Sequence, residues 1–213
     1  MGGITAWIHS AAYMIGIGMY FAVLSPIIDA SPDQYLSQLT QYQNILYIWI
    51  LIAYWVSAFC LVIVALALYE RLKDGMSAVM QVATALALIW ASLIIGSGNL
   101  MLHGFIQIPQ IYAGNPAQAE TVLLALGIVE NGIVSGNELI GGLWILFLSW
   151  SALQTGKFSK SLNYLGLLIG AAGIISIVPH LAESATIFAL GMIVWFAWTG
   201  TILLRKNTNN QVS

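Results

Sequence analysis

Two glutamates and two asparagines lie inside a long apolar segment, Thr121–Leu153, where acidic side chains are costly. Residues seven apart lie on nearly the same face of a helix, and this spacing relates Glu130 to Asn137. The same spacing relates Asn131 to Glu138. An acidic residue at the centre of a bilayer costs about 2.5–3.5 kcal/mol on insertion scales. The four side chains are therefore predicted to face protein, water or a ligand rather than lipid.

A second polar stripe precedes the first in the chain. Its members, spaced four, three and four residues apart, are Ser92, Gly96, Asn99 and His103. Residues three and four apart are neighbours on a helix surface, so this spacing predicts one polar face. The face ends at a histidine, which is a side chain that binds both protons and metals.

A third polar stripe is expected at the end of the segment Leu162–Leu181. Its members, at spacings of three, four and three residues, are Gly173, Ser176, His180 and Glu183. A proline inside a helix removes one backbone hydrogen bond, so Pro179 is expected to kink the helix at this point.

The three stripes overlap in depth. At about 1.5 Å per residue, Glu138, His180 and Asn99 lie about 22, 27 and 28 Å from the ends of their helices that carry basic residues. We therefore expect a polar cavity in the half of the bilayer away from those ends. The candidate ligand-binding residues are Asn99, His103, Glu130, Asn131, Asn137, Glu138, His180 and Glu183.

These residue types permit several kinds of chemistry. Zn²⁺ and other divalent metals accept imidazole and carboxylate ligands, so His103, Glu138 and His180 form a candidate metal site. Two histidines at similar depth also permit haem ligation. The same groups would serve proton transfer or bind a cationic solute. Without a ligand, they would pair with one another as interhelical hydrogen bonds.

The composition predicts an all-α, polytopic transmembrane bundle forming one domain, residues 1–213, surrounded by the lipid bilayer. Hydrophobic residues make up 60% of the chain and charged residues 7%, against about 25% charged in soluble domains. The apolar runs are continuous rather than alternating, which argues against an outer-membrane barrel. A net charge of −2 without basic runs gives no sign of nucleic-acid binding.

About six apolar segments approach the ~20 residues that cross a bilayer as a helix. They are Ala6–Ile28, Ile45–Tyr69, Met76–Phe105, Thr121–Leu153, Leu162–Leu181 and Thr186–Leu204. Two polar loops, Asp29–Asn44 and Ile106–Glu120, are each long enough to hold a short interfacial helix.

The basic residues predict the orientation. All six follow the second, fourth and sixth apolar segments, and they are Arg71, Lys73, Lys157, Lys160, Arg205 and Lys206. Lysine and arginine concentrate in the cytoplasmic loops of membrane proteins. We therefore expect both termini in the cytoplasm and a location in the bacterial inner (plasma) membrane, with the polar cavity facing outward.

Glycines at a spacing of four predict close helix contacts. The pairs are Gly132 with Gly136 and Gly166 with Gly170. Small residues at this spacing let two helix backbones approach each other. The contact is expected either within the bundle or between chains, so a homo-oligomer and a partner in a membrane complex both stay open.

Two stretches resemble a known family. The stretch Leu66–Lys73 runs from the end of an apolar segment into a short basic turn, and Trp150–Gly166 contains a second basic turn followed by Leu165-Gly166. Both resemble a bacterial six-helix membrane family catalogued as a domain of unknown function, number 4386. The chain departs from the family pattern at Phe158-Ser-Lys160, where the family has Leu-Pro-Arg, and it lacks an Arg early in the third segment. The resemblance implies a fold and no particular activity.

The sequence therefore predicts an integral membrane protein of the binding or transport type, whose cavity accepts a small ligand, a proton or a metal ion. One alternative is a membrane enzyme that uses the same groups for metal-assisted or acid–base chemistry in the outer leaflet. Another is an accessory subunit whose polar stripes pack against a partner.

Overall fold

The computed structural model describes residues 1–28 and 32–209, and within these two ranges every regular element is a helix. The predicted all-α fold is therefore confirmed. The first part of the chain forms α1 (Gly2–Met19), the π-helical segment η1 (Tyr20–Leu24), α2 (Ser25–Ile28) and α3 (Pro32–Gln41). The next part forms α4 (Gln43–Ile50), the π-helical segment η2 (Leu51–Val56) and α5 (Ser57–Leu72).

The second half of the chain contains the longest helices. They are α6 (Ser77–Gly114), α7 (Pro116–Thr155), α8 (Lys160–Ile175), the 3₁₀ turn η3 (Pro179–Leu181) and α9 (Ser184–Asn209). Helices α6 and α7 have 38 and 40 residues, which corresponds to about 57 and 60 Å. Because the hydrocarbon core of a bilayer is about 30 Å thick, both helices are much longer than a straight span requires.

Five stretches within the described residues are long and apolar enough to cross a membrane: Gly2–Ile27, Gln43–Leu72, Ser77–Gly114, Pro116–Thr155 and Ser184–Arg205. The expectation of a multi-pass bundle is thereby supported. The predicted fifth span differs, because α8 ends at Ile175 and is about 24 Å long. The chain continues through a turn that contains Pro179, whose ring cannot continue an α-helix without loss of a backbone hydrogen bond.

The two polar loops have different outcomes. The first loop, which is long enough to hold a short helix, contains α3. The second, Ile106–Glu120, is not a loop with its own helix, because α6 runs on through Pro109 to Gly114. The chain turns at Asn115, whose side-chain oxygen accepts a hydrogen bond from the backbone N–H of Gln118 at 3.2 Å and caps α7.

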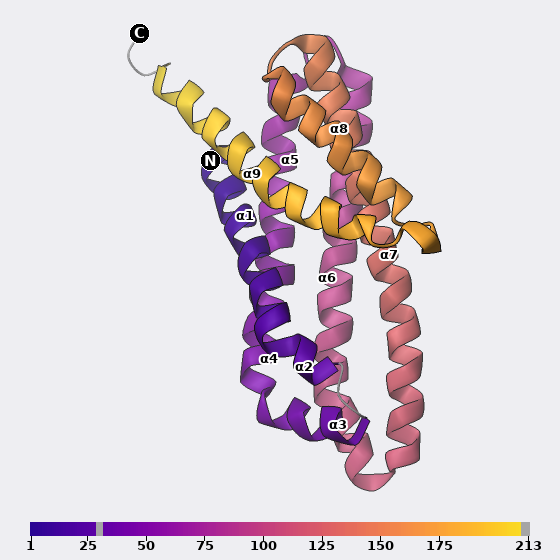
Figure 1. Ribbon diagram of the computed structural model, residues 1–213. Coiled ribbons are helices and arrows are strands. Elements are labelled where there is room, and N and C mark those ends of the chain that lie inside the picture. The colour runs from indigo at the N-terminus through magenta and orange to yellow at the C-terminus, as the bar shows by residue number, and fades with distance from the viewer. Residues whose placement is uncertain (29–31, 210–213) are drawn as a thin grey trace.

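The turns that carry basic residues meet at one end of the bundle, at the top of Figure 1. The ammonium of Lys157, after α7, donates to the backbone oxygen of Arg71 at 2.7 Å and to Asp74 Oδ2 at 3.1 Å. The start of α1 and the last turns of α9 also lie together, since Gly3 faces the backbone of Gly200. We call this end the basic end and the opposite end, where α6 meets α7, the distal end.

Two clusters of buried apolar residues hold the bundle together. The basic-end core joins α1, α5, α6, α7, α8 and α9 around Trp90, Trp144, Trp195, Phe188 and Phe196. The distal core consists of Leu24, Leu39, Leu46, Trp49, Ile50, Met101, Phe105, Ile108 and Ala119. The candidate site lies where the two cores meet.

Candidate functional site

Two π-helical segments shape one wall of the site. Tyr20 begins η1 at the end of α1, and Ala53 and Tyr54 lie within η2 between α4 and α5. A π turn closes each backbone hydrogen bond over five residues instead of four, and such turns occur often at functional sites. All three residues line the same cavity. The two irregular helix segments therefore face one another across the site.

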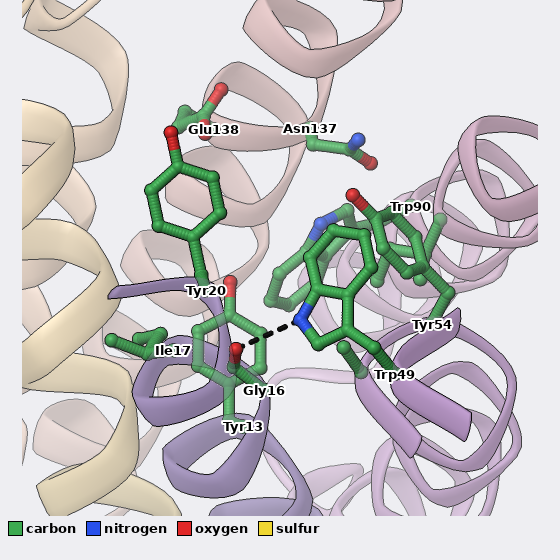
Figure 2. Close-up of a pocket in the computed structure, with 11 residues that line it drawn as sticks. Tyr13, Gly16, Ile17, Tyr20, Trp49, Tyr54, Trp90, Asn137 and Glu138 are labelled. Atoms are coloured by element: carbon green, nitrogen blue, oxygen red, sulfur yellow. Dashed lines mark hydrogen bonds between the residues drawn. The ribbon is translucent and has the colours of Figure 1, made fainter. Parts of the chain in front are cut away.

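The aromatic cavity lies between α1, the α4–η2 segment, α6 and α7 and has a volume of about 230 Å³. Figure 2 shows its walls. Five of the eleven lining residues are aromatic, namely Tyr13, Tyr20, Trp49, Tyr54 and Trp90. The remaining lining residues are Gly16, Ile17, Ala53, Ile94, Asn137 and Glu138.

The rings of the cavity are held in place by hydrogen bonds. Trp49 Nε1 donates to the backbone oxygen of Gly16 at 2.9 Å, which ties α4 to α1 (Figure 2). The hydroxyl of Tyr54 donates to Met101 Sδ at 3.1 Å. The rings of Trp49 and Tyr54 also meet edge to face, with centroids 5.2 Å apart. Two of the five rings of the wall are therefore fixed by contacts with neighbouring elements.

The polar groups of the cavity come from α7. Asn137 Nδ2 donates to Ser97 Oγ of α6 at 3.4 Å, whereas its carbonyl oxygen is buried without a hydrogen-bond partner. A buried acceptor without a donor costs about 1–3 kcal/mol. Figure 2 shows the carboxylate of Glu138 on the same side of the cavity, with the hydroxyl of Tyr20 pointing toward it. The cavity thus presents acceptors to any group that enters it.

A second, larger cavity of about 670 Å³ adjoins the first on the distal side. The two cavities share Tyr20, Trp49 and Tyr54. The further lining of this distal cavity is Tyr35, Met101, Phe105, Leu123, Leu124, Leu126, Gly127, Ile128, Glu130 and Asn131. It combines an apolar wall from α6 and α7 with one carboxylate. None of the described residues that line either cavity is Lys, Arg or His.

The structure divides the eight candidate residues from the sequence into two groups. Asn137 and Glu138 line the aromatic cavity, and Glu130 and Asn131 line the distal cavity. The other four have exposed side chains and line neither cavity: Asn99, His103, His180 and Glu183. The first polar stripe thus reaches both cavities, although the second and third do not.

The stripe expected from Gly173 to Glu183 does not form as one helical face. Helix α8 ends before Ser176, His180 lies in η3, and Glu183 precedes α9. In Figure 1 this turn lies at the opposite side of the bundle from α4. Gly173, the first residue of the expected stripe, lies in α8 against the backbone oxygen of Glu138. This contact is on the side of α7 that packs on α8.

The candidate metal site is not assembled in this structure. Within residues 1–28 and 32–209, no group of three or more His, Cys, Asp or Glu side chains lies close enough to hold a metal ion. His103, Glu138 and His180 therefore do not come together as ligands of Zn²⁺. The same dispersal gives no support to a haem held between His103 and His180.

Sequence reasoning missed the tyrosines of the site. Tyr13 and Tyr20 are seven residues apart in the first apolar segment, the same spacing that marked Glu130 and Asn137. That spacing, at a depth close to the acidic stripe, was a usable signal. The tryptophans Trp49 and Trp90 carried none, because a buried tryptophan in an apolar helix is ordinarily a packing residue.

Five apolar helices long enough to cross a bilayer place this chain in the class of multi-pass α-helical membrane proteins. The chain belongs to the family described as "Domain of unknown function (DUF4386)", whose profile matches residues 11–206. The match includes both Leu66–Lys73 and Trp150–Gly166 and confirms the resemblance seen at those turns. No curated protein and no solved structure matches the chain.

Proposed function

We propose that this membrane protein binds a small organic cation in the aromatic cavity, with Glu138 as the counter-charge. The observation that carries the proposal is the composition of the cavity wall: five aromatic rings, one carboxylate and one unpartnered carbonyl oxygen, with no basic residue among the lining residues. The negative face of an aromatic ring attracts a cation by about 0.5–2 kcal/mol, and a desolvated site is at the upper end of that range. No cationic side chain among the lining residues would balance the charge of an anion there.

Burial in the bundle supports the same proposal. A carboxylate placed in an apolar environment is costly unless a cation or several donors compensate for it. Two ion pairs are present among the described residues, Lys73 with Glu70 and Lys157 with Asp74. Both lie at the basic end and neither includes Glu138. A bound cation would supply the charge that the neighbouring side chains do not.

Equilibrium dialysis with tetraethylammonium tests the proposal, using the protein in a non-ionic detergent at neutral pH. We expect saturable binding that Glu138→Gln weakens by at least about tenfold, because the substitution removes a charged partner. Glu120→Gln, on the same helix but exposed at its distal end, is the matched control and should leave binding unchanged. Equal binding by Glu138→Gln and the wild type would sink the proposal.

The ring of Tyr20 offers a second pair of variants. Tyr20 is 36% exposed, so its replacement is not expected to disturb the core. Tyr20→Phe retains an aromatic face and should retain most of the affinity, whereas Tyr20→Leu should weaken binding by several-fold. Equal affinities in the two variants would show that the ring face does not hold the cation.

We also propose that the basic end faces the cytoplasm of a bacterial cell and that the protein lies in the inner membrane. The supporting observation is that helix ends and turns at one side of the bundle carry the basic residues Arg71, Lys157, Lys160 and Arg205. In a Cys60→Ser background, a cysteine at Glu120 should react with an impermeant thiol reagent on intact cells, and one at Lys160 should not. The reverse pattern would overturn the orientation.

A further inference from the structure

The aromatic and distal cavities adjoin and are together called the cleft, and the lining of each contains one carboxylate. Glu138 lines the aromatic cavity and Glu130 lines the distal cavity. The cavities share the rings of Tyr20, Trp49 and Tyr54. These shared rings therefore lie between the two acidic groups, and nothing basic lines either part of the cleft among the described residues.

The separation of the acidic groups is set by α7. Glu130 and Glu138 are eight residues apart on one continuous helix. Eight residues advance an α-helix by about 12 Å. A single small ammonium group cannot meet both carboxylates at that separation, so a ligand that satisfies both must be elongated.

The wall between the acidic groups is apolar or aromatic. Besides the shared rings, the distal cavity is lined by Met101, Phe105 and Leu126. Such a wall favours methylene groups over polar ones, because burial of each CH₂ contributes about 0.8 kcal/mol. Each end of the cleft also has an asparagine next to the carboxylate, Asn131 beside Glu130 and Asn137 beside Glu138. Amide oxygens accept hydrogen bonds from ammonium groups.

We propose that the natural ligand is a linear dication, an α,ω-diammonium compound with a methylene chain between its charged ends. The inference rests on the proposed function, since it places one ammonium group in the aromatic cavity at Glu138. The other ammonium group binds at Glu130, and the chain lies along Tyr20, Trp49 and Tyr54. An extended carbon chain with bonds of about 1.5 Å advances about 1.3 Å per bond, so a chain of about eight carbons spans about 12 Å between its nitrogens.

The test measures binding of a series of α,ω-diaminoalkanes of about four to about twelve carbons to the protein in a non-ionic detergent. Monoaminoalkanes of the same lengths serve as comparators. We expect affinity to peak near about eight carbons and to exceed that of the monoamine of equal length by about tenfold or more. An affinity that does not change with chain length, or monoamines that bind as tightly as diamines, would overturn the proposal of a dication. The apolar chain would then be the only feature of the ligand that the protein recognises.

Two variants test which carboxylate binds each ammonium group of the ligand. Glu130→Gln should remove the advantage of the diamine over the monoamine of equal length, whereas Glu138→Gln should weaken binding of both. Glu120→Gln is again the control. An unchanged diamine advantage in Glu130→Gln overturns the inference. The proposed function fails separately, because it depends on tetraethylammonium and Glu138 alone.

Loss of fold in a variant is detected independently. Cys60 is the only cysteine of the chain and is buried in α5. A thiol-reactive dye therefore reports unfolding in detergent. Glu130→Gln and Glu138→Gln should unfold at wild-type temperature or above, since each removes a charge from an apolar environment. Retained fold with unchanged diamine binding would count against the dication.

Discussion

The two halves of α7 have the same secondary structure and opposite surroundings. Toward the basic end, Trp144 is 1% exposed and its ring contacts Trp90, Trp195 and Phe196. Toward the distal end, Leu124 is 72% and Ile128 75% exposed. The half of α7 toward the basic end is enclosed by other helices on most sides. The distal half is open to the surroundings where Leu124 and Ile128 border the distal cavity.

The glycines of α7 follow the same division. A Cβ on Gly142 would meet the backbone oxygen of Gly170 at 2.8 Å, and one on Gly141 would meet the ring of Phe188 at 2.7 Å. A Cβ on Gly127 or Gly132 would meet nothing within 4 Å. Packing therefore requires glycine in the basic-end half and does not require it at those two positions in the distal half.

The aromatic residues of the two regions differ in what their faces contact. In the basic-end core, the rings of Trp144, Trp195 and Phe196 pack on one another. In the cleft, the rings of Tyr13 and Tyr20 border a space. Trp90 belongs to both regions. The comparison indicates that the basic-end part of α7 holds the fold, whereas the part from Glu138 toward the distal end lines the two cavities. Each of the following substitutions tests one side of that division.

The largest effect is expected from Trp144→Ala, because it removes a ring that is in contact with three other aromatic residues. Truncation of a buried tryptophan costs about 3–5 kcal/mol of unfolding free energy. Trp150→Ala, on the same helix but 50% exposed, is the control and should change stability by about 0.5 kcal/mol or less. Dye labelling of Cys60 during heating gives both values. Equal losses would mean that the tryptophan cluster is not the main source of stability.

A smaller loss is expected from Gly142→Ala. The added methyl group meets backbone of α8, which cannot move away as a side chain can, so α7 and α8 must separate. Overpacking of this kind costs about 1–3 kcal/mol. Gly132→Ala should instead be neutral or slightly stabilising, because alanine is favoured over glycine within a helix and the site is open. If Gly132→Ala proved the more damaging change, the division of α7 would be wrong.

The sequence predicted the fold class and the family because each depends on long apolar runs or on local turns. It predicted the close contact at Gly166 and Gly170, which the structure shows against α7. At Gly132 and Gly136 the structure shows no close contact within the bundle, since a Cβ on Gly136 would meet its nearest neighbour, Leu93 Cδ1, only at 3.7 Å. A contact of this pair with a second chain stays a prediction. Glycine spacing marks a helix that is able to pack closely, but only the partner helix decides whether it does.

That the candidate residues bind a ligand stays a prediction, but the geometry of their stripes can be compared with the structure. The stripe on α7 was derived from a helical period, and the period holds, so all four of its residues line a cavity. Depth alone was used to join it to His103 and His180, and depth does not determine which side of a helix faces which neighbour. The sequence did not predict the π-helical segments η1 and η2, because a π turn arises from packing around a helix rather than from a residue type.

The smallest effect concerns how firmly α3 covers the distal half. Burial, together with the nearby Glu130 carboxylate, raises the pKa of Tyr35 on α3 to about 12, against about 10 for an exposed tyrosine. The folded protein therefore holds this proton more tightly than the unfolded chain, and the free energy of unfolding should fall as pH rises from about 10 to about 12. Below about pH 10 the Tyr35 hydroxyl is neutral in both states, so its ionisation adds no pH dependence there.

Tyrosinate absorbance of the wild type minus that of Tyr35→Phe isolates this group. The difference signal should develop near pH 12 in the folded protein and near pH 10 after denaturation, which serves as the control. Glu130→Gln should move the folded transition to lower pH, because the neighbouring negative charge is removed. A folded transition already near pH 10 would mean that α3 leaves Tyr35 in water. The distal half would then be an open groove, and the contrast with the basic-end half would be larger than the structure shows.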